Sequence, residues 1–96
     1  MLNSKTLFRK AANFFEEQLN EGIVIIPLVN QVADMKKIFT LKDTAQFIWN
    51  EIDGTQTFEQ ILEKLVRTYD IDKENASADM NEFLLAISRF LEKVNE

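Results

Sequence analysis

The spacing of hydrophobic positions changes about halfway along the chain. In the first half, apolar residues form short runs at 23–26, 32–35 and 38–41. The first run is β-branched throughout and only four residues long, which favours a buried strand over a helix. Pro27 follows directly and has no N–H for a ladder, so this strand is expected to end, to bulge or to lie at an edge there. The pattern predicts a small antiparallel sheet of about three strands.

In the second half, apolar residues recur at intervals of three and four, the period of an amphipathic helix. Three stripes occur: Ala45, Ile48, Trp49 and Ile52; Phe58, Ile61, Leu62, Leu65, Val66 and Tyr69; and Ala76, Met80, Phe83, Leu84, Ile87, Phe90, Leu91 and Val94. The expected caps are Asp43, Thr57 and Asp72, with Gln46 and Gln60 completing capping boxes for the first two. We therefore expect an α+β fold in which the sheet is followed by three helices, like a winged helix-turn-helix.

The amino-terminal segment has no clear strand pattern. Its apolar residues Leu7, Phe8, Ala11, Phe15 and Leu19 recur near the helical period. Residues 1–13 are expected to be a flexible or helical extension, and residues 14–96 a single domain. Periodicity leaves helix or strand open for residues 14–19.

Composition narrows the chemistry. Ninety-six residues suffice for one compact core, and the chain contains neither Cys nor His. Catalytic triads and the usual zinc sites are thereby excluded, and the two glycines form no phosphate-binding loop. The longest apolar run is far below the roughly 20 residues of a membrane span. We expect a cytoplasmic protein that is not an enzyme and has no cofactor, metal or membrane partner.

The net charge of −5 is unevenly distributed. Residues 1–15 carry three bases and no acid, which leaves 8 bases and 16 acids, a balance of −8, for the remainder. Nucleic-acid binders gain affinity by neutralising phosphates with clustered Lys and Arg. An acidic body repels phosphates, so we expect no nucleic-acid partner.

Short motifs in a fixed order carry a more specific resemblance. They are Ile26-Pro27, Asp34-Met35-Lys36-Lys37, Leu41-Lys42-Asp43-Thr44-Ala45, Phe47-Ile48-Trp49, Asp53-Gly54, Tyr69-Asp70-Ile71-Asp72, and Ala78-Asp79-Met80 followed by Phe83-Leu84. From residue 14 to about residue 91 this order resembles the PqqD family, the small domain also called the RiPP precursor recognition element. The resemblance places a strand at residues 14–19.

The chain departs from the family pattern at two turns. The family's hairpin Asn-Gly is Lys36-Lys37 here, which fits a type I′ turn poorly, so this connection is expected to be wider or less ordered. The family's Asn cap before the first helix is Lys42 here, so capping is expected to shift to Asp43 or Thr40.

The resemblance implies a peptide-binding adaptor. In this family a precursor's leader peptide adds as an extra strand, lies against the third helix, and is presented to a modifying enzyme, often a radical SAM protein. The receiving strand would be Ile38, Phe39, Thr40 and Leu41, and the helix side Leu84, Leu85 and Ser88. Leu85 falls opposite the core face, where it is either an isolated exposed residue or a contact for the enzyme or a second copy. The acidic body suggests a leader with basic residues.

Two other functions stay open on the sequence. A winged-helix transcription regulator would need a basic recognition helix, whereas the second and third helices carry mixed charges. A dimeric interaction domain would use an apolar edge, with a homodimer as its product.

Overall fold

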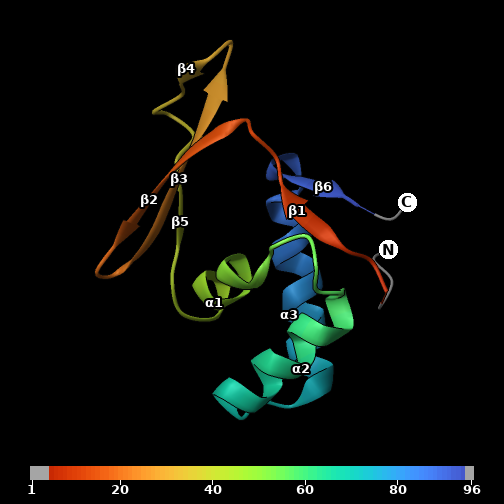
Figure 1. Cartoon of the computed structure of the whole chain (residues 1–96). Coiled ribbons are helices and arrows are strands. Elements are labelled where there is room, and N and C mark those ends of the chain that lie inside the picture. The colour runs from red at the N-terminus through yellow and green to blue at the C-terminus, as the bar shows by residue number, and fades with distance from the viewer. Residues whose placement is uncertain (1–4, 95–96) are drawn as a thin grey trace.

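The computed structural model describes residues 5–94. The strands β1 (Phe8–Lys10), β2 (Phe14–Leu19), β3 (Gly22–Val29), β4 (Val32–Ala33) and β5 (Phe39–Leu41) come first. The helices α1 (Asp43–Glu51), α2 (Phe58–Tyr69) and α3 (Lys73–Ala86) follow, then a 3₁₀ turn, η1 (Ser88–Phe90), and the strand β6 (Leu91–Lys93). Figure 1 shows the three helices gathered on one side of the main sheet. The expected α+β class, with an antiparallel sheet and three helices, is confirmed.

The strand β3 is the centre of the main sheet. On one side it pairs with β2 over the whole length of that strand, and on the other side with β5 and then β4. The strand continues through Pro27 to Val29, so the expectation that it would end, bulge or lie at an edge there is wrong. Pro27 is tolerated because it lies between the parts of β3 that pair with β5 and with β4. Its carbonyl accepts the N–H of Asp34 at 2.7 Å.

A two-residue turn joins β3 to β4. Asn30 and Gln31 have φ of 53° and 66°, the left-handed pair that a two-residue type I′ turn requires. The next connection, which contains Lys36 and Lys37, is wider. There Asp34 accepts the N–H of Lys36 with Oδ1 and that of Lys37 with its carbonyl, both at 3.2 Å.

Residues near the amino terminus belong to the fold. The strand β1 pairs with β6, and the two lie side by side next to α3 (Figure 1). Phe8 is 4% exposed and part of the core, and the Thr6 carbonyl accepts the N–H of Phe58 at 2.9 Å. Residues 8–10 therefore form a strand where the sequence analysis expected a flexible or helical extension. Backbone pairing with β6, near the other end of the chain, overrides the local helical spacing.

The third helix is shorter than its apolar stripe indicated. Helix α3 ends at Ala86, so the expected helical position of Phe90, Leu91 and Val94 is wrong. The turn η1 directs Phe90 into the core, where it is 0% exposed, and the next residues pair with β1. If α3 continued as a helix, the Phe90 ring would not be buried in this way and β1 would have no strand to pair with.

Two of the three expected caps are confirmed. Thr57 and Gln60 form the reciprocal capping box of α2, and Asp72 caps α3 by accepting the N–H of Asn75. The expected cap of α1 is wrong. Lys42 is its N-cap and makes no side-chain bond there, while Asp43 is already the first helical residue, with φ of 54°.

Candidate functional site

The strand β5 has a neighbour on only one side. Backbone groups along β3 alternate between its two neighbours: Leu28 donates to Asn13 beside β2, and Pro27 accepts on the opposite side. By this alternation Ile23 and Ile25 face β5, where their register partners are Leu41 and Phe39. The backbone groups of Thr40, between these partners, therefore point away from β3. Within residues 5–94 no strand pairs with that edge.

The opposite edge of the sheet, along β2, is also unpaired within residues 5–94, but polar side chains flank it. The register places Glu16 beside Ile25 and Gln18 beside Ile23, so both point toward the helix side of the sheet. Gln18 donates to Glu16 and to Asn50 of α1. Charged side chains that point inward hinder the addition of another strand. The corresponding positions of β5 are the apolar Phe39 and Leu41, so β5 is the more receptive edge.

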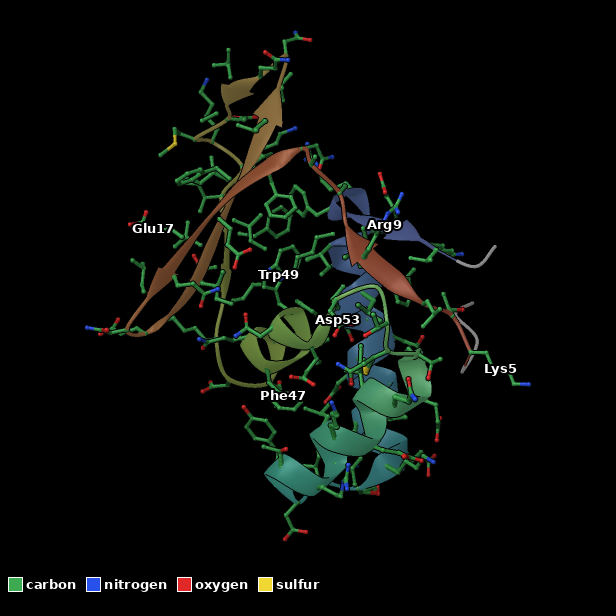
Figure 2. All side chains as sticks on the ribbon, viewed as in Figure 1. Lys5, Arg9, Glu17, Phe47, Trp49 and Asp53 are labelled. Atoms are coloured by element: carbon green, nitrogen blue, oxygen red, sulfur yellow. The ribbon has the colours of Figure 1, made fainter. Side chains whose placement is uncertain are left out.

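Lys10 adds a further charged side chain beside the β2 edge. Its Nζ lies 4.5 Å from the centroid of the Trp49 ring and 3.9 Å from Oε1 of Glu16. Burial lowers the pKa of Lys10 below its ordinary 10.5, and the negative charge of Glu16 partly opposes this. Figure 2 shows Trp49 extending from α1 into the space between the sheet and α3.

Aromatic rings support β5 from the helix side. The ring of Phe39 lies edge-on to that of Phe90, with centroids 5.4 Å apart. Phe90 in turn contacts Phe14 at 5.5 Å, and Phe14 contacts Trp49 at 5.2 Å, both again edge-on. These contacts connect the receptive edge to η1, directly after α3. The β5 edge therefore packs against a cluster of aromatic rings.

The predicted site residues differ in accessibility. In the receiving strand, Ile38 is 41% exposed, Thr40 is exposed, Phe39 is half-buried and Leu41 is buried. The residues from the helix side are separated: Leu84 is 2% exposed in the core, Leu85 is 64% exposed, and Ser88 is exposed in η1. Phe90, which joins the helix side to β5, was not among the predicted site residues. Its spacing fits the helical stripe of α3, and no local signal marks the end of that helix at Ala86.

Away from β5, one surface hollow is lined by polar side chains. It has a volume of about 450 Å³ and is lined by Asp53, Thr55, Gln56, Gln60, Glu63, Lys64 and Arg67. Hydrogen bonds from the backbone N–H and hydroxyl of Thr55 lower the pKa of Asp53 below 3.8. In the described part of the chain, no three acidic side chains gather as a metal site would require. No helix there is long and apolar enough to cross a membrane.

Comparison with known proteins identifies the family of the chain. The family model of coenzyme PQQ synthesis protein D (PqqD) matches residues 11–89. The chain belongs to the PqqD family. Among solved structures, the PqqD-family chain is similar to "TbiB1 in Complex with the TbiA(beta) Leader Peptide", with a TM-score of 0.72 and 19% sequence identity. The match covers 92% of this chain and 99% of that one and establishes a shared fold. No curated protein sequence matches.

Proposed function

We propose that this PqqD-family protein is a cytoplasmic, non-catalytic adaptor for a precursor peptide. It binds the leader segment as an additional strand along β5 and presents the precursor to a modifying enzyme, for example a radical SAM protein. The observation that carries the proposal is the open edge at Thr40, whose backbone groups point away from β3. The similarity to a protein solved with a leader peptide supports the same conclusion.

Strand addition explains how a three-residue edge holds a peptide. Each backbone hydrogen bond to the groups around Ile38 and Thr40 contributes about 1 kcal/mol. Successive side chains of the added strand point to opposite faces of the sheet. Those on the helix side meet Phe39 and the end of α3, where Leu84 supports the site from the core and Ser88 lies at the surface. Pockets for alternate side chains then provide selectivity.

The proposed adaptor leaves the chemistry to its partner enzyme. The chain contains no Cys or His and so lacks a thiolate nucleophile and the commonest general base. Leu85, 64% exposed on α3, is the residue we assign to contact with the enzyme. A transcription regulator is less well supported, because the exposed charged residues of α2 include Glu63 as well as Arg67, and the half-buried Glu59 and Lys64 are likewise of opposite sign.

A titration followed by amide NMR tests the adaptor function. The ligand is a leader peptide encoded beside the gene for this protein. We expect shifts confined to residues 38–41 and to the end of α3 with η1, saturating in the micromolar range. If several hundred micromolar peptide shifts no amide, that peptide is not the cargo. If the shifts instead follow residues 14–19, the peptide uses the other edge and the assignment to β5 is wrong.

The outer face of the sheet favours a second candidate function, a homodimer interface. Phe15, Leu19 and Ile38 are 55%, 49% and 41% exposed there, and Val24 and Ile26 between them are half-buried. A twofold dimer would cover this face with the same face of a second copy. Sedimentation equilibrium tests this candidate: a dimer that Phe15→Ser converts to monomer supports it, and a monomeric wild type excludes it.

A further inference from the structure

Three lysines without a charged partner in the described part of the chain lie near the ends of β5. Lys36 and Lys37 precede β5 with only Ile38 between, Lys42 lies directly after it, and residues 36–42 contain no acid. Within residues 5–94 the side chains of these three lysines make no ion pair or hydrogen bond. Several other cations are already paired: Arg9 with Glu92, Lys10 with Glu16, Lys64 with Glu51, and Lys73 with Glu59. A chain of net charge −5 therefore keeps three unpaired cations at its open strand.

The acids that flank β5 along the chain offset the charge of these lysines only in part. Asp34 precedes the lysines and uses its carboxylate to accept the N–H of Lys36. Asp43 follows them as the first residue of α1. The segment from Asp34 to Asp43 thus contains three bases and two acids, with the bases nearer to the strand.

The lysines lie at both ends of the row that an added strand would face. Lys42 continues the alternation of Ile38 and Thr40, which places it on the outer face of the sheet. Its Cγ indeed lies over Gly22, 3.1 Å from where a Cβ on that glycine would be. A peptide paired with Thr40 would extend toward Lys42 at one end and toward the turn with Lys36 at the other. Opposite charges on neighbouring strands stabilise the pairing.

The two open edges of the sheet carry opposite charges. The strand β2 contains Glu16 and Glu17, and Glu21 follows in the next turn. In Figure 2, Glu17 points away from the helices, on the outer face. An acidic peptide would be repelled from β2 and attracted to β5. Charge therefore distinguishes two edges that offer the same backbone hydrogen bonds.

We propose that the peptide segment recognised at β5 is acidic, with carboxylates at one or both ends of the paired stretch that contact Lys36, Lys37 and Lys42. The inference rests on the proposed function and names its substrate class. The net negative charge of the chain suggested a basic leader. The segment proposed here is acidic, because the cations beside β5 are local and unpaired. Binding of such a segment weakens as salt is added, since these lysines are exposed to solvent.

A random peptide library displayed on phage tests the charge preference. Full-length protein is immobilised as wild type, as K36E/K37E/K42E, and as the control K64E/R67E/K73E on the α2 side. The two triple variants lower the net charge by the same amount, and thermal unfolding confirms that each is folded. We expect wild type and control to enrich acidic peptides. The affinity of these peptides for K36E/K37E/K42E should be about tenfold weaker, as three lost cross-strand charge pairs imply.

Thr40→Pro removes the outward N–H of β5 and separates failure of the inference from failure of the proposed function. Peptides that require Thr40 but carry no excess of acids, or that bind K36E/K37E/K42E equally well, would overturn the charge preference and leave strand addition intact. Peptides that bind Thr40→Pro as well as wild type, or a library that enriches nothing, would overturn strand addition at β5 and the inference with it.

Discussion

The rings of Phe39 and Phe90 meet edge-on, with centroids 5.4 Å apart and planes at 86°. Phe39 belongs to the strand proposed to receive a peptide, and Phe90 follows the helix against which the peptide would lie. The two residues are 51 positions apart, and this contact sets the spacing between strand and helix end. Phe90 is completely buried, whereas Phe39 is half-buried and leaves part of its ring available.

The ring contact should be measurable as a coupling energy. Aromatic pairs of this geometry contribute about 0.5–1.5 kcal/mol beyond the area they bury. A double-mutant cycle with Phe39→Leu and Phe90→Leu should show this coupling in urea unfolding followed by Trp49 fluorescence. Phe47, whose ring packs on Tyr69 rather than on Phe90, provides the control. Phe47→Leu and Phe90→Leu should be additive, and an additive Phe39 cycle would contradict the proposed link.

Strand addition at β5 predicts that proline abolishes peptide binding when it is placed in β5 but not when it is placed in β2. Thr40 and Gln18 both direct their backbone groups away from β3, so proline at either position removes no backbone hydrogen bond between the strands. Thr40→Pro should abolish leader-peptide binding, and Gln18→Pro should leave it unchanged. Fluorescence anisotropy with a labelled leader peptide measures both.

Thr40→Val keeps the N–H and completes the proline comparison. It should bind like wild type if the backbone, rather than the hydroxyl, makes the contact. Loss of binding in Gln18→Pro with binding intact in Thr40→Pro would move the site to β2.

Local signals in the sequence predicted the parts of the fold that are determined locally. The capping box of Thr57 and Gln60 and the cap at Asp72 are confirmed because cap and partner lie three residues apart. The strand β1 and the end of α3 were missed for a common reason. The strands β1 and β6 exist only through pairing between the two ends of the chain, and neither carries a pattern of its own.

The candidate site was only partly readable from the sequence. The strand at residues 38–41 followed from its apolar run and the family resemblance, but its openness depends on the strand order, which no local pattern encodes. On the helix side, helical spacing had placed Leu84 in the apolar stripe and Leu85 opposite it, and their exposures of 2% and 64% confirm both. The Phe90 contact required a break in α3 that the apolar spacing hid.

The pairing of the two chain ends predicts a large effect of a single residue near the amino terminus. Phe8 is 4% exposed, so Phe8→Ala should lower the free energy of unfolding by about 3–5 kcal/mol. Its neighbour Arg9 is the matched control, since its ion pair with Glu92 is exposed and contributes about 0–1 kcal/mol. Urea unfolding of Phe8→Ala and Arg9→Ala measures both. Equal, small effects would mean that residues 1–13 are an extension outside the cooperative fold.

The Asp53 carboxylate predicts a pH-dependent contribution to stability. Hydrogen bonds from Thr55 lower its pKa in the folded state below 3.8, so the stabilisation is present above pH 3.8 and is lost as pH falls through the lower, folded-state pKa. Asp53→Asn should therefore be slightly less stable than wild type near neutral pH. The difference should disappear well below pH 3.8. Thermal unfolding across that range measures it, and a difference that does not change with pH would contradict the assignment.

Lys42 connects the stability of α1 with the proposed charge preference. It occupies the N-cap with extended backbone angles but makes no capping bond, and a lysine opposes the helix dipole there. Lys42→Asn should raise the free energy of unfolding by about 1 kcal/mol. It should also weaken binding of an acidic peptide, because one of the three cations is lost. Lys36→Asn, which removes a charge but creates no cap, should weaken binding without changing stability. If Lys42→Asn binds acidic peptides as tightly as wild type does, Lys42 is not part of the recognition.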